Sequence, residues 1–347
     1  MYIKKILVAI VLVGLVAGGI LAYTVYDAFF TPNTKFNNDK AYVFIPTNSN
    51  INDVEVLLEP ILEDISSFLS AAERKKYSVN VKAGKYALKK GMNNNEIIGV
   101  LRSGNTPVKV AFNNQETIAD LAGRISKQIE ADSLSLLSAF TDASFLKENG
   151  FNADTNLAMY IANSYEFFWN TSPEGFRNKM LKEYAKFWNE NRLKKAKALN
   201  LTPIEVVSLA AIVHKETAKI DERPRVAGLY LNRIRKGMLL QADPTVIYAL
   251  KKDQNNFGLV IKRVLYKDLE IDSPYNTYKY TGVPPGPITM PDISAIDAVL
   301  SSERHEYIYM VANVENFGYH KFARTAAQHN RNKVQYVRWI NAKKINR

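Results

Sequence analysis

Residues 209–217 read Leu-Ala-Ala-Ile-Val-His-Lys-Glu-Thr, and they place an acidic residue on the apolar face of a predicted helix. Apolar residues before it recur at the spacing of one helical face, at Val206, Leu209, Ala210 and Val213. Glu216 is the next position on that face. The pattern therefore predicts a carboxyl group that points toward the protein interior.

The start of this helix is marked by three residues. Thr202 is a predicted N-cap, Pro203 suits the first turn, and Glu205 is the return partner of a capping box. Glu216 then falls in the last turn, where the helix dipole is negative and partial burial disfavours an anion. Both effects raise the pKa of its carboxyl group, as a general acid that works near neutral pH requires.

A structural interpretation of Glu216 is also open. In it, the side chain only flanks a helix end, where it is solvated or paired with Lys215 or Arg225. Spacing alone favours this interpretation, because most acids in such positions are structural.

The N-terminus carries a long apolar segment. Residues 6–26 contain no charge and follow Lys4 and Lys5. This pattern predicts a single transmembrane helix with a cytoplasmic N-terminus, so that the rest of the 347 residues lies outside. A cleaved signal peptide is the alternative, but the run is long enough to cross a bilayer and no small-x-small cleavage site follows it.

Composition narrows the function further. The chain has no Cys, which excludes a lipoprotein anchor, disulfides and Cys-based metal sites or nucleophiles. Half of the net charge of +12 lies in residues 331–347, which hold six basic residues and no acid. This tail is either a solvated helix face or frayed end, or a site that attracts anionic lipid or polymer. No nucleic-acid module is present, so we expect no nucleic-acid partner.

The chain divides into five predicted parts and belongs to the α+β class. Residues 1–26 are a cytoplasmic stub and transmembrane helix, 27–40 a linker, 41–112 a small module ordered strand, helix, helix, strand, 113–200 a helical connecting region, and 201–347 a mixed α+β domain with the basic tail. Within the small module, Asn93 to Asn95 can cap a further helix that Gly104 ends.

The last part contains several further predicted elements. A second helix spans residues 223–235, and a third begins at Asp243, which we expect to be its N-cap rather than a second catalytic acid. Residues 273–291 are rich in Pro, Tyr, Gly and Asn and predict an ordered loop. Residues 307–312 and 320–323 predict a hairpin.

Six blocks in this part, taken together, resemble the MltG or YceG-like family of membrane-anchored endolytic murein transglycosylases. They are Ile-Val-His-Lys-Glu-Thr (212–217), Arg-Val-Ala-Gly-Leu-Tyr-Leu-Asn-Arg (225–233), Gly-Met-Leu-Leu-Gln-Ala-Asp-Pro-Thr-Val-Ile-Tyr (237–248), Ser-Pro-Tyr-Asn-Thr-Tyr (273–278), Gly-Val-Pro-Pro-Gly-Pro-Ile (282–288) and His-Asn (329–330). The resemblance extends to the N-terminal anchor and to residues 83–86, which look like the family's LysM-like subdomain.

The chain departs from the family pattern at three places. His214 stands where the family usually has a second acid, so Glu216 matches the catalytic acid. Ala242 replaces a usual Ser or Thr, and residues 162–165 replace a Pro-Asp-Thr-Tyr sequence with Ala-Asn-Ser-Tyr.

The resemblance implies cleavage of the β-1,4 bond between N-acetylmuramic acid and N-acetylglucosamine inside peptidoglycan strands, which gives 1,6-anhydro ends and terminates nascent glycan elongation. Glu216 would protonate the departing oxygen and then take the proton of the C6 hydroxyl, in contrast to the two carboxyl groups of most glycosidases. The intramolecular attack also benefits from proximity.

The same blocks supply candidate substrate-binding residues. We expect hydrogen bonds from Gln241, Asn276 and Asn330 and apolar contacts from Tyr248, Tyr275 and Tyr278, and the resemblance adds Asp243, Thr245 and His329. Alternatively, these are loop-structuring polar and core aromatic residues. We expect no cofactor, and no spacing among the four His supports a metal site.

Two other functions remain open. One is a scaffold that holds glycan without cutting it. The other is a glycoside hydrolase with a second acid, for which the candidates are Asp221, Glu222, Asp243 and Asp272. The retained Glu216 favours an enzyme, and the lack of a paired acid in the motif favours a transglycosylase. The expected partners are peptidoglycan strands, the bacterial inner membrane through residues 6–26, and peptidoglycan synthases, with the catalytic region periplasmic or extracytoplasmic.

Overall fold

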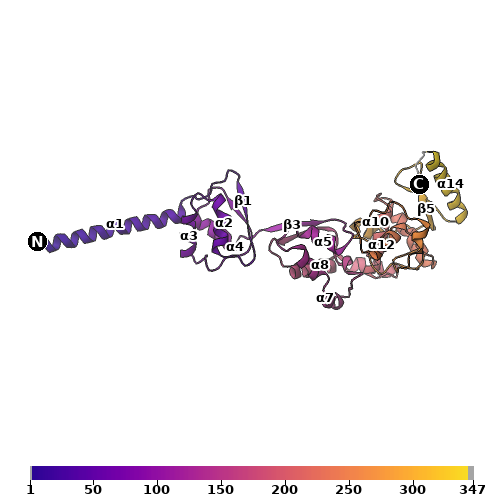
Figure 1. Ribbon diagram of the computed structural model, residues 1–347, viewed down its shortest axis with the longest axis horizontal. Helices are drawn as coiled ribbons and strands as arrows, with labels where there is room; N and C mark the ends of the chain where they lie inside the picture. The colour runs from indigo at the N-terminus through magenta and orange to yellow at the C-terminus, as the bar shows by residue number, and fades with distance from the viewer. Residues whose placement is uncertain (1, 343–347) are drawn as a thin grey trace. The chain divides into compact units, whose positions relative to one another are not determined.

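The computed structural model describes residues 2–342 and separates into two compact units (Figure 1). The first unit holds the chain up to residue 110 with residues 127–131 and 165–172, and the second holds residues 111–126, 132–164 and the chain from 173 onward. Helices predominate and the strands form two-stranded sheets, so the predicted α+β class is confirmed. The five-part division stays a prediction.

The apolar N-terminal segment forms one helix, α1 (Tyr2–Phe30), which has no buried residue and contains an 18-residue stretch with a mean hydropathy of 2.7. It extends beyond the predicted span at both ends. Within the described residues it is the one helix long and apolar enough by itself to cross a bilayer, a test that a signal sequence also passes. Its C-terminal part contacts α3 (Ile65–Arg74) and α4 (Asn94–Ser103).

The segment after α1, which falls in the predicted linker of residues 27–40, is held to the small module at Asn33. Asn33 is 4% exposed, and its side-chain amide donates to the Asp64 carbonyl at 2.7 Å and to Asn94 Oδ1 at 2.8 Å. Its Oδ1 accepts from the Asp64 amide at 2.7 Å. Buried hydrogen bonds therefore hold this segment at Asn33, although most of its other residues are exposed.

The small module has the predicted order. β1 (Lys40–Ile45) pairs antiparallel with β2 (Gly84–Lys89), and α2 (Ile51–Leu58), the 3-10 helix η1 (Glu59–Ile61) and α3 lie between them in the chain. The capping of α4 by Asn93 is also confirmed, because Asn93 and Glu96 form a complete capping box. Phe68, Tyr77 and Tyr86 lie in the core of this module.

The connecting region is mostly helical, as expected. Its elements are β3 (Pro107–Phe112), α5 (Ile118–Ile125), α6 (Ser133–Phe140), α7 (Ala143–Glu148), η2 (Asn156–Met159), β4 (Asn163–Phe168), α8 (Pro173–Phe187) and α9 (Glu190–Ala198). The strand β4, which pairs with β3, was not predicted.

The core of the second unit surrounds α10 (Pro203–Glu216). All eight residues from Val206 to Val213 are buried, so the helix is covered on every side rather than on one face. It contacts α11 (Arg223–Arg235), α12 (Asp243–Asp253) and α13 (Ile293–Leu300). The predicted capping box of Thr202 and Glu205 is confirmed at its start.

The remaining elements complete this unit. After η3 (Tyr266–Glu270), residues 273–291 form the predicted loop without helix or strand. The predicted hairpin is confirmed as β5 (Tyr309–Ala312) and β6 (His320–Ala323), and α14 (Ala326–Ala342) contacts both strands. Neither α13 nor α14 was predicted as a helix in its own right, and the basic residues 343–347 lie outside the described residues.

Asn33→Ala should lower the free energy of unfolding by about 2 kcal/mol, because buried polar partners lose their hydrogen bonds. The matched control is Asn38→Ala in the same segment, where the side chain is exposed. Denaturant unfolding of the full chain in detergent, followed by circular dichroism, measures both. Equal stability of the two variants would mean that the segment is a linker after all.

Candidate active site

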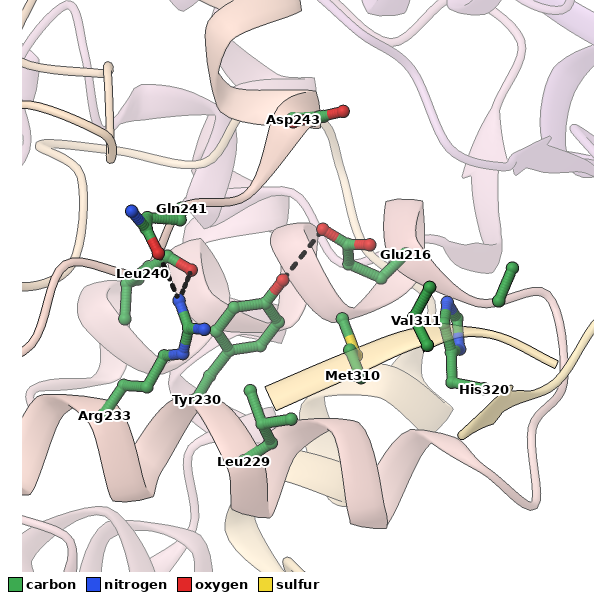
Figure 2. A pocket seen from close by; sticks show the side chains of 11 residues that line it. Glu216, Leu229, Tyr230, Arg233, Leu240, Gln241, Asp243, Met310, Val311 and His320 are labelled. Carbon is green, nitrogen blue, oxygen red and sulfur yellow. Dashed lines mark hydrogen bonds between the residues drawn. The ribbon is translucent and has the colours of Figure 1, made fainter. Parts of the chain in front are cut away.

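Glu216 is the last residue of α10 and opens onto a cavity of about 240 Å³ (Figure 2). The helix that carries it is fixed by its buried surroundings, so the position of the carboxyl group is fixed as well. The polar and charged residues on the cavity wall come from several elements, and they are Glu216, Tyr230, Arg233, Gln241, Asp243 and His320.

The carboxyl group of Glu216 accepts one hydrogen bond from the Tyr230 hydroxyl, at 2.8 Å to Oε1. Desolvation raises the pKa of Glu216, and the nearby Asp243 raises it further. The hydrogen bond from Tyr230 and the charges of His320 and Arg233 act in the opposite direction. Burial is the largest of these effects, so the protonated form is favoured relative to an exposed Glu.

Neither Lys215 nor Arg225 pairs with Glu216. Lys215 is exposed, and Arg225 pairs with Glu303, at 3.0 Å between Nε and Oε2. Among the described residues, Glu216 forms no ion pair. The interpretation of Glu216 as the acid of a helix-end ion pair is therefore wrong.

Arg233 on α11 is 7% exposed and braces one side of the cavity. Its Nη1 donates to the carbonyls of Leu239 and Leu240 at 3.1 and 2.8 Å and to Gln241 Oε1 at 3.3 Å. Its Nε donates to the Ile308 carbonyl at 2.7 Å, just before β5. The guanidinium thus holds the turn in which Gln241 adopts a φ of 52°, a conformation unusual for a residue other than Gly.

Asp243 is not the N-cap that we predicted. Ala242 occupies that position without a side-chain hydrogen bond, and Asp243 is the first residue of α12. Its Oδ1 instead accepts from the Tyr278 hydroxyl at 2.6 Å, and the residue lines the cavity that contains Glu216 (Figure 2).

His214 lies off the cavity wall, although it is two residues from Glu216. Its Nδ1 is 3.3 Å from Asp292 Oδ2 and 3.2 Å from Arg223 Nη2. Burial lowers the pKa of its imidazole, while Asp292 opposes that shift. The residue therefore takes part in an ion-pair cluster that joins α10 to the start of α13.

Comparison with known proteins identifies the family. The sequence model of the YceG-like family matches residues 43–335, which is most of the chain. This chain belongs to the YceG-like family. The family resemblance inferred from the sequence is therefore confirmed.

Two relatives of known name are similar along most of this chain. The chain is 29% identical to the endolytic murein transglycosylase of Bacillus subtilis (strain 168), over 95% of this chain and 93% of that protein. It is 28% identical to the endolytic murein transglycosylase of Streptococcus pneumoniae serotype 2 (strain D39 / NCTC 7466), over 92% of this chain but 63% of that protein. A crystal structure of a putative yceG-like protein from Listeria monocytogenes has 29% identity and a TM-score of 0.55, and the match covers 85% of this chain and 99% of that one.

Three of the residues that the YceG-like blocks suggested for sugar contact are buried and bonded within the protein. The Thr245 hydroxyl donates to the Ala242 carbonyl at 2.7 Å, and the Tyr275 hydroxyl donates to Asp154 Oδ1 at 3.1 Å. The Asn276 side-chain amide donates to two carbonyls of the preceding segment, each at 2.8 Å. None of the three is more than 1% exposed, so in this structure their side chains shape the loop, and sugar contact by them stays a prediction.

The other predicted residues are spread around the second unit. Gln241 and Asp243 line the Glu216 cavity. Tyr278 is not part of the cavity wall, but its hydroxyl donates a hydrogen bond to Asp243. Tyr248 lines a separate cavity of about 290 Å³. His329 stacks on Tyr309 with ring centroids 5.1 Å apart, and Asn330 is exposed on α14.

Of the four candidates for a second acid, Asp243 alone lines the Glu216 cavity. Asp221 accepts from the Tyr319 hydroxyl at 3.0 Å and Asp272 from the Tyr280 hydroxyl at 2.7 Å. Glu222 is 4% exposed and pairs with His320 at 3.0 Å. We predicted residue 320 only as part of the hairpin, so the place of His320 on the cavity wall was missed.

Glu216→Gln should change how stability depends on pH. Because burial raises the pKa of Glu216 above that of an exposed Glu, its contribution to stability is present below the usual pKa and is lost as pH rises through the folded pKa. The wild type should therefore lose stability relative to the variant between about pH 4 and about pH 8. Urea unfolding of both proteins at these two pH values measures the difference, and a pH-independent difference would contradict the shift.

Proposed function

We propose that this chain is a lytic transglycosylase that cleaves the β-1,4 bond between N-acetylmuramic acid and N-acetylglucosamine inside peptidoglycan strands. The observation that carries the proposal is the position of Glu216, partly buried in a cavity at the end of a fixed helix with a raised pKa and no ion-pair partner among the described residues. Relatives named endolytic murein transglycosylase support it.

In the first step, protonated Glu216 donates its proton to the glycosidic oxygen as the bond from that oxygen to C1 of the muramyl residue breaks. Desolvation supports this step, because it keeps the carboxyl group protonated at a higher pH than in water. The Tyr230 hydroxyl at 2.8 Å remains as a donor to the carboxylate that is formed.

In the second step, the C6 hydroxyl of the same muramyl residue attacks C1, and its proton passes to the Glu216 carboxylate. A C1–O6 bond forms and closes a 1,6-anhydro ring, and Glu216 regains the proton that it lost. The nucleophile belongs to the substrate, so one carboxyl group serves both steps and water does not enter the product.

One observation favours a second candidate function, a two-carboxylate glycoside hydrolase. Asp243 shares the cavity with Glu216 and lies close enough to influence its pKa. A hydrolase would use this carboxylate as base or nucleophile and would leave a reducing end. The two functions therefore differ in the chemistry of the product.

We further infer that α1 anchors the enzyme in the cell membrane with its N-terminus in the cytoplasm. Its length and its exposed apolar surface support the anchor, and Lys4 and Lys5 near its N-terminal end support this orientation. The cavity would then act outside the cytoplasm, where peptidoglycan is found. Termination of nascent strands and association with peptidoglycan synthases extend this proposal.

The test is digestion of purified peptidoglycan by the full chain in detergent, with mass spectrometry of the product ends. Wild type should give anhydro-muramyl ends, and Glu216→Gln should lower the rate by about 10²- to 10⁴-fold, as expected for loss of a general acid. Glu190→Gln, which changes an exposed acid on α9, is the matched control and should retain the wild-type rate.

Asp243→Asn separates the two functions. A transglycosylase variant should still form anhydro ends, with a loss of rate smaller than that of Glu216→Gln. Reducing ends from the wild type that disappear in Asp243→Asn would establish the hydrolase instead. Wild-type protein that binds peptidoglycan without cutting it would exclude both enzymatic functions and indicate a glycan-binding scaffold.

A further inference from the structure

Glu222 and His320 form a buried pair beside Glu216. Glu222 lies between α10 and α11 and is 4% exposed. Its Oε2 is 3.0 Å from Nδ1 of His320, and its Oε1 accepts from the backbone amide of His320 at 2.6 Å. Two hydrogen bonds to one carboxylate therefore fix both the position and the ring orientation of this His on β6.

The pair leaves one nitrogen of His320 unused. An ionised carboxylate can only accept, so Nδ1 carries the hydrogen that faces Glu222. No group in the described part of the chain hydrogen-bonds Nε2, and the imidazole lines the cavity that Glu216 shares. Figure 2 shows it standing beside Val311, on the same side of the cavity as Glu216.

Glu222 also connects this His to the end of α10. The side chain of Thr217, the residue directly after Glu216, lies close enough to lower the pKa of the Glu222 carboxyl group. Hydrogen bonds, those of His320 foremost, outweigh burial and hold the pKa of Glu222 below its usual value. One ionised, buried carboxylate thus ties the hairpin to the end of the helix that carries Glu216.

We propose that Glu222 is a positioning residue that holds His320 at the cavity wall. There, the positive charge of His320 stabilises the carboxylate that Glu216 becomes between its two proton transfers. This inference rests on the proposed function, because only a single acid that later serves as base needs such support. This charge is that of a proton on Nε2, in addition to the hydrogen that Nδ1 donates to Glu222.

The surroundings of Glu216 explain why this charge matters. Burial favours its acid form, as the first step requires, but it also disfavours the carboxylate that must act as base in the second step. Tyr230 and Arg233 face it from α11, Asp243 from α12 and His320 from β6. Arg233 donates through Nη1 and Nε to backbone carbonyls and to Gln241, and Asp243 is repulsive. Of the two basic side chains on this wall, His320 lowers the pKa of Glu216 more than Arg233 does.

The experiment is the pH profile of kcat/KM for the full chain, compared with the variant His320→Gln. The high-pH limb reports loss of the proton from Glu216. Removal of the positive charge should move that limb upward by about one pH unit, the low end of the effect of a close opposite charge. The rate at neutral pH should fall about tenfold, because the carboxylate is less stabilised by the same factor.

Glu222→Gln should move the limb in the same direction, and the double variant should add little, since the two residues act as a unit. Tyr319→Phe is the matched control: it changes the residue next to His320, whose hydroxyl contacts Asp221 outside the cavity, and it should leave the limb in place. His320→Gln provides the test without Glu222→Gln if the latter fails to fold.

A fall in rate that is equal at all pH values, with no movement of the limb, would overturn the inference and leave His320 a structural residue. That result would leave the proposed function intact if Glu216→Gln is inactive. Activity retained in Glu216→Gln would instead overturn the proposed function itself.

Discussion

Eight consecutive buried residues fix α10 in the core of the second unit, so the helix cannot turn or slide without exposing apolar surface. Glu216 is its last residue and inherits that fixed position. Every other feature of the site is arranged about this carboxyl group: Tyr230 donates to it, and the segments after α11 form the opposite wall. Burial that stabilises the fold is thus also the cause of the raised pKa.

Local features of the fold were predictable because they depend on neighbours in sequence. The capping box at Thr202, the capping of α4 by Asn93 and the hairpin of β5 and β6 are signalled by residue types at short spacing. The place of Glu216 at the end of an apolar helix was predictable for the same reason. Family resemblance then distinguished between a structural and a functional acid, which spacing alone could not.

What the sequence did not show depends on contacts between distant segments. Glu222 and His320 are 98 positions apart, so no local pattern links them. From the sequence, Asn33 is a plausible linker residue, but in the structure it accepts a hydrogen bond from the Asp64 amide. Thr245 is likewise a plausible ligand contact, but its hydroxyl is hydrogen-bonded to that of Thr277. Polar residues at such positions are ambiguous, because burial in a satisfied network and exposure to solvent both favour polar side chains.

In the proposed reaction one carboxyl group serves as acid and then as base, and no water enters the product. Digestion of peptidoglycan by the full chain in water enriched in ¹⁸O tests this most directly. The newly formed ends should carry no ¹⁸O, because the C6 hydroxyl of the sugar supplies the attacking oxygen. One ¹⁸O atom at each new end would show instead that water attacks and that the reaction is hydrolysis.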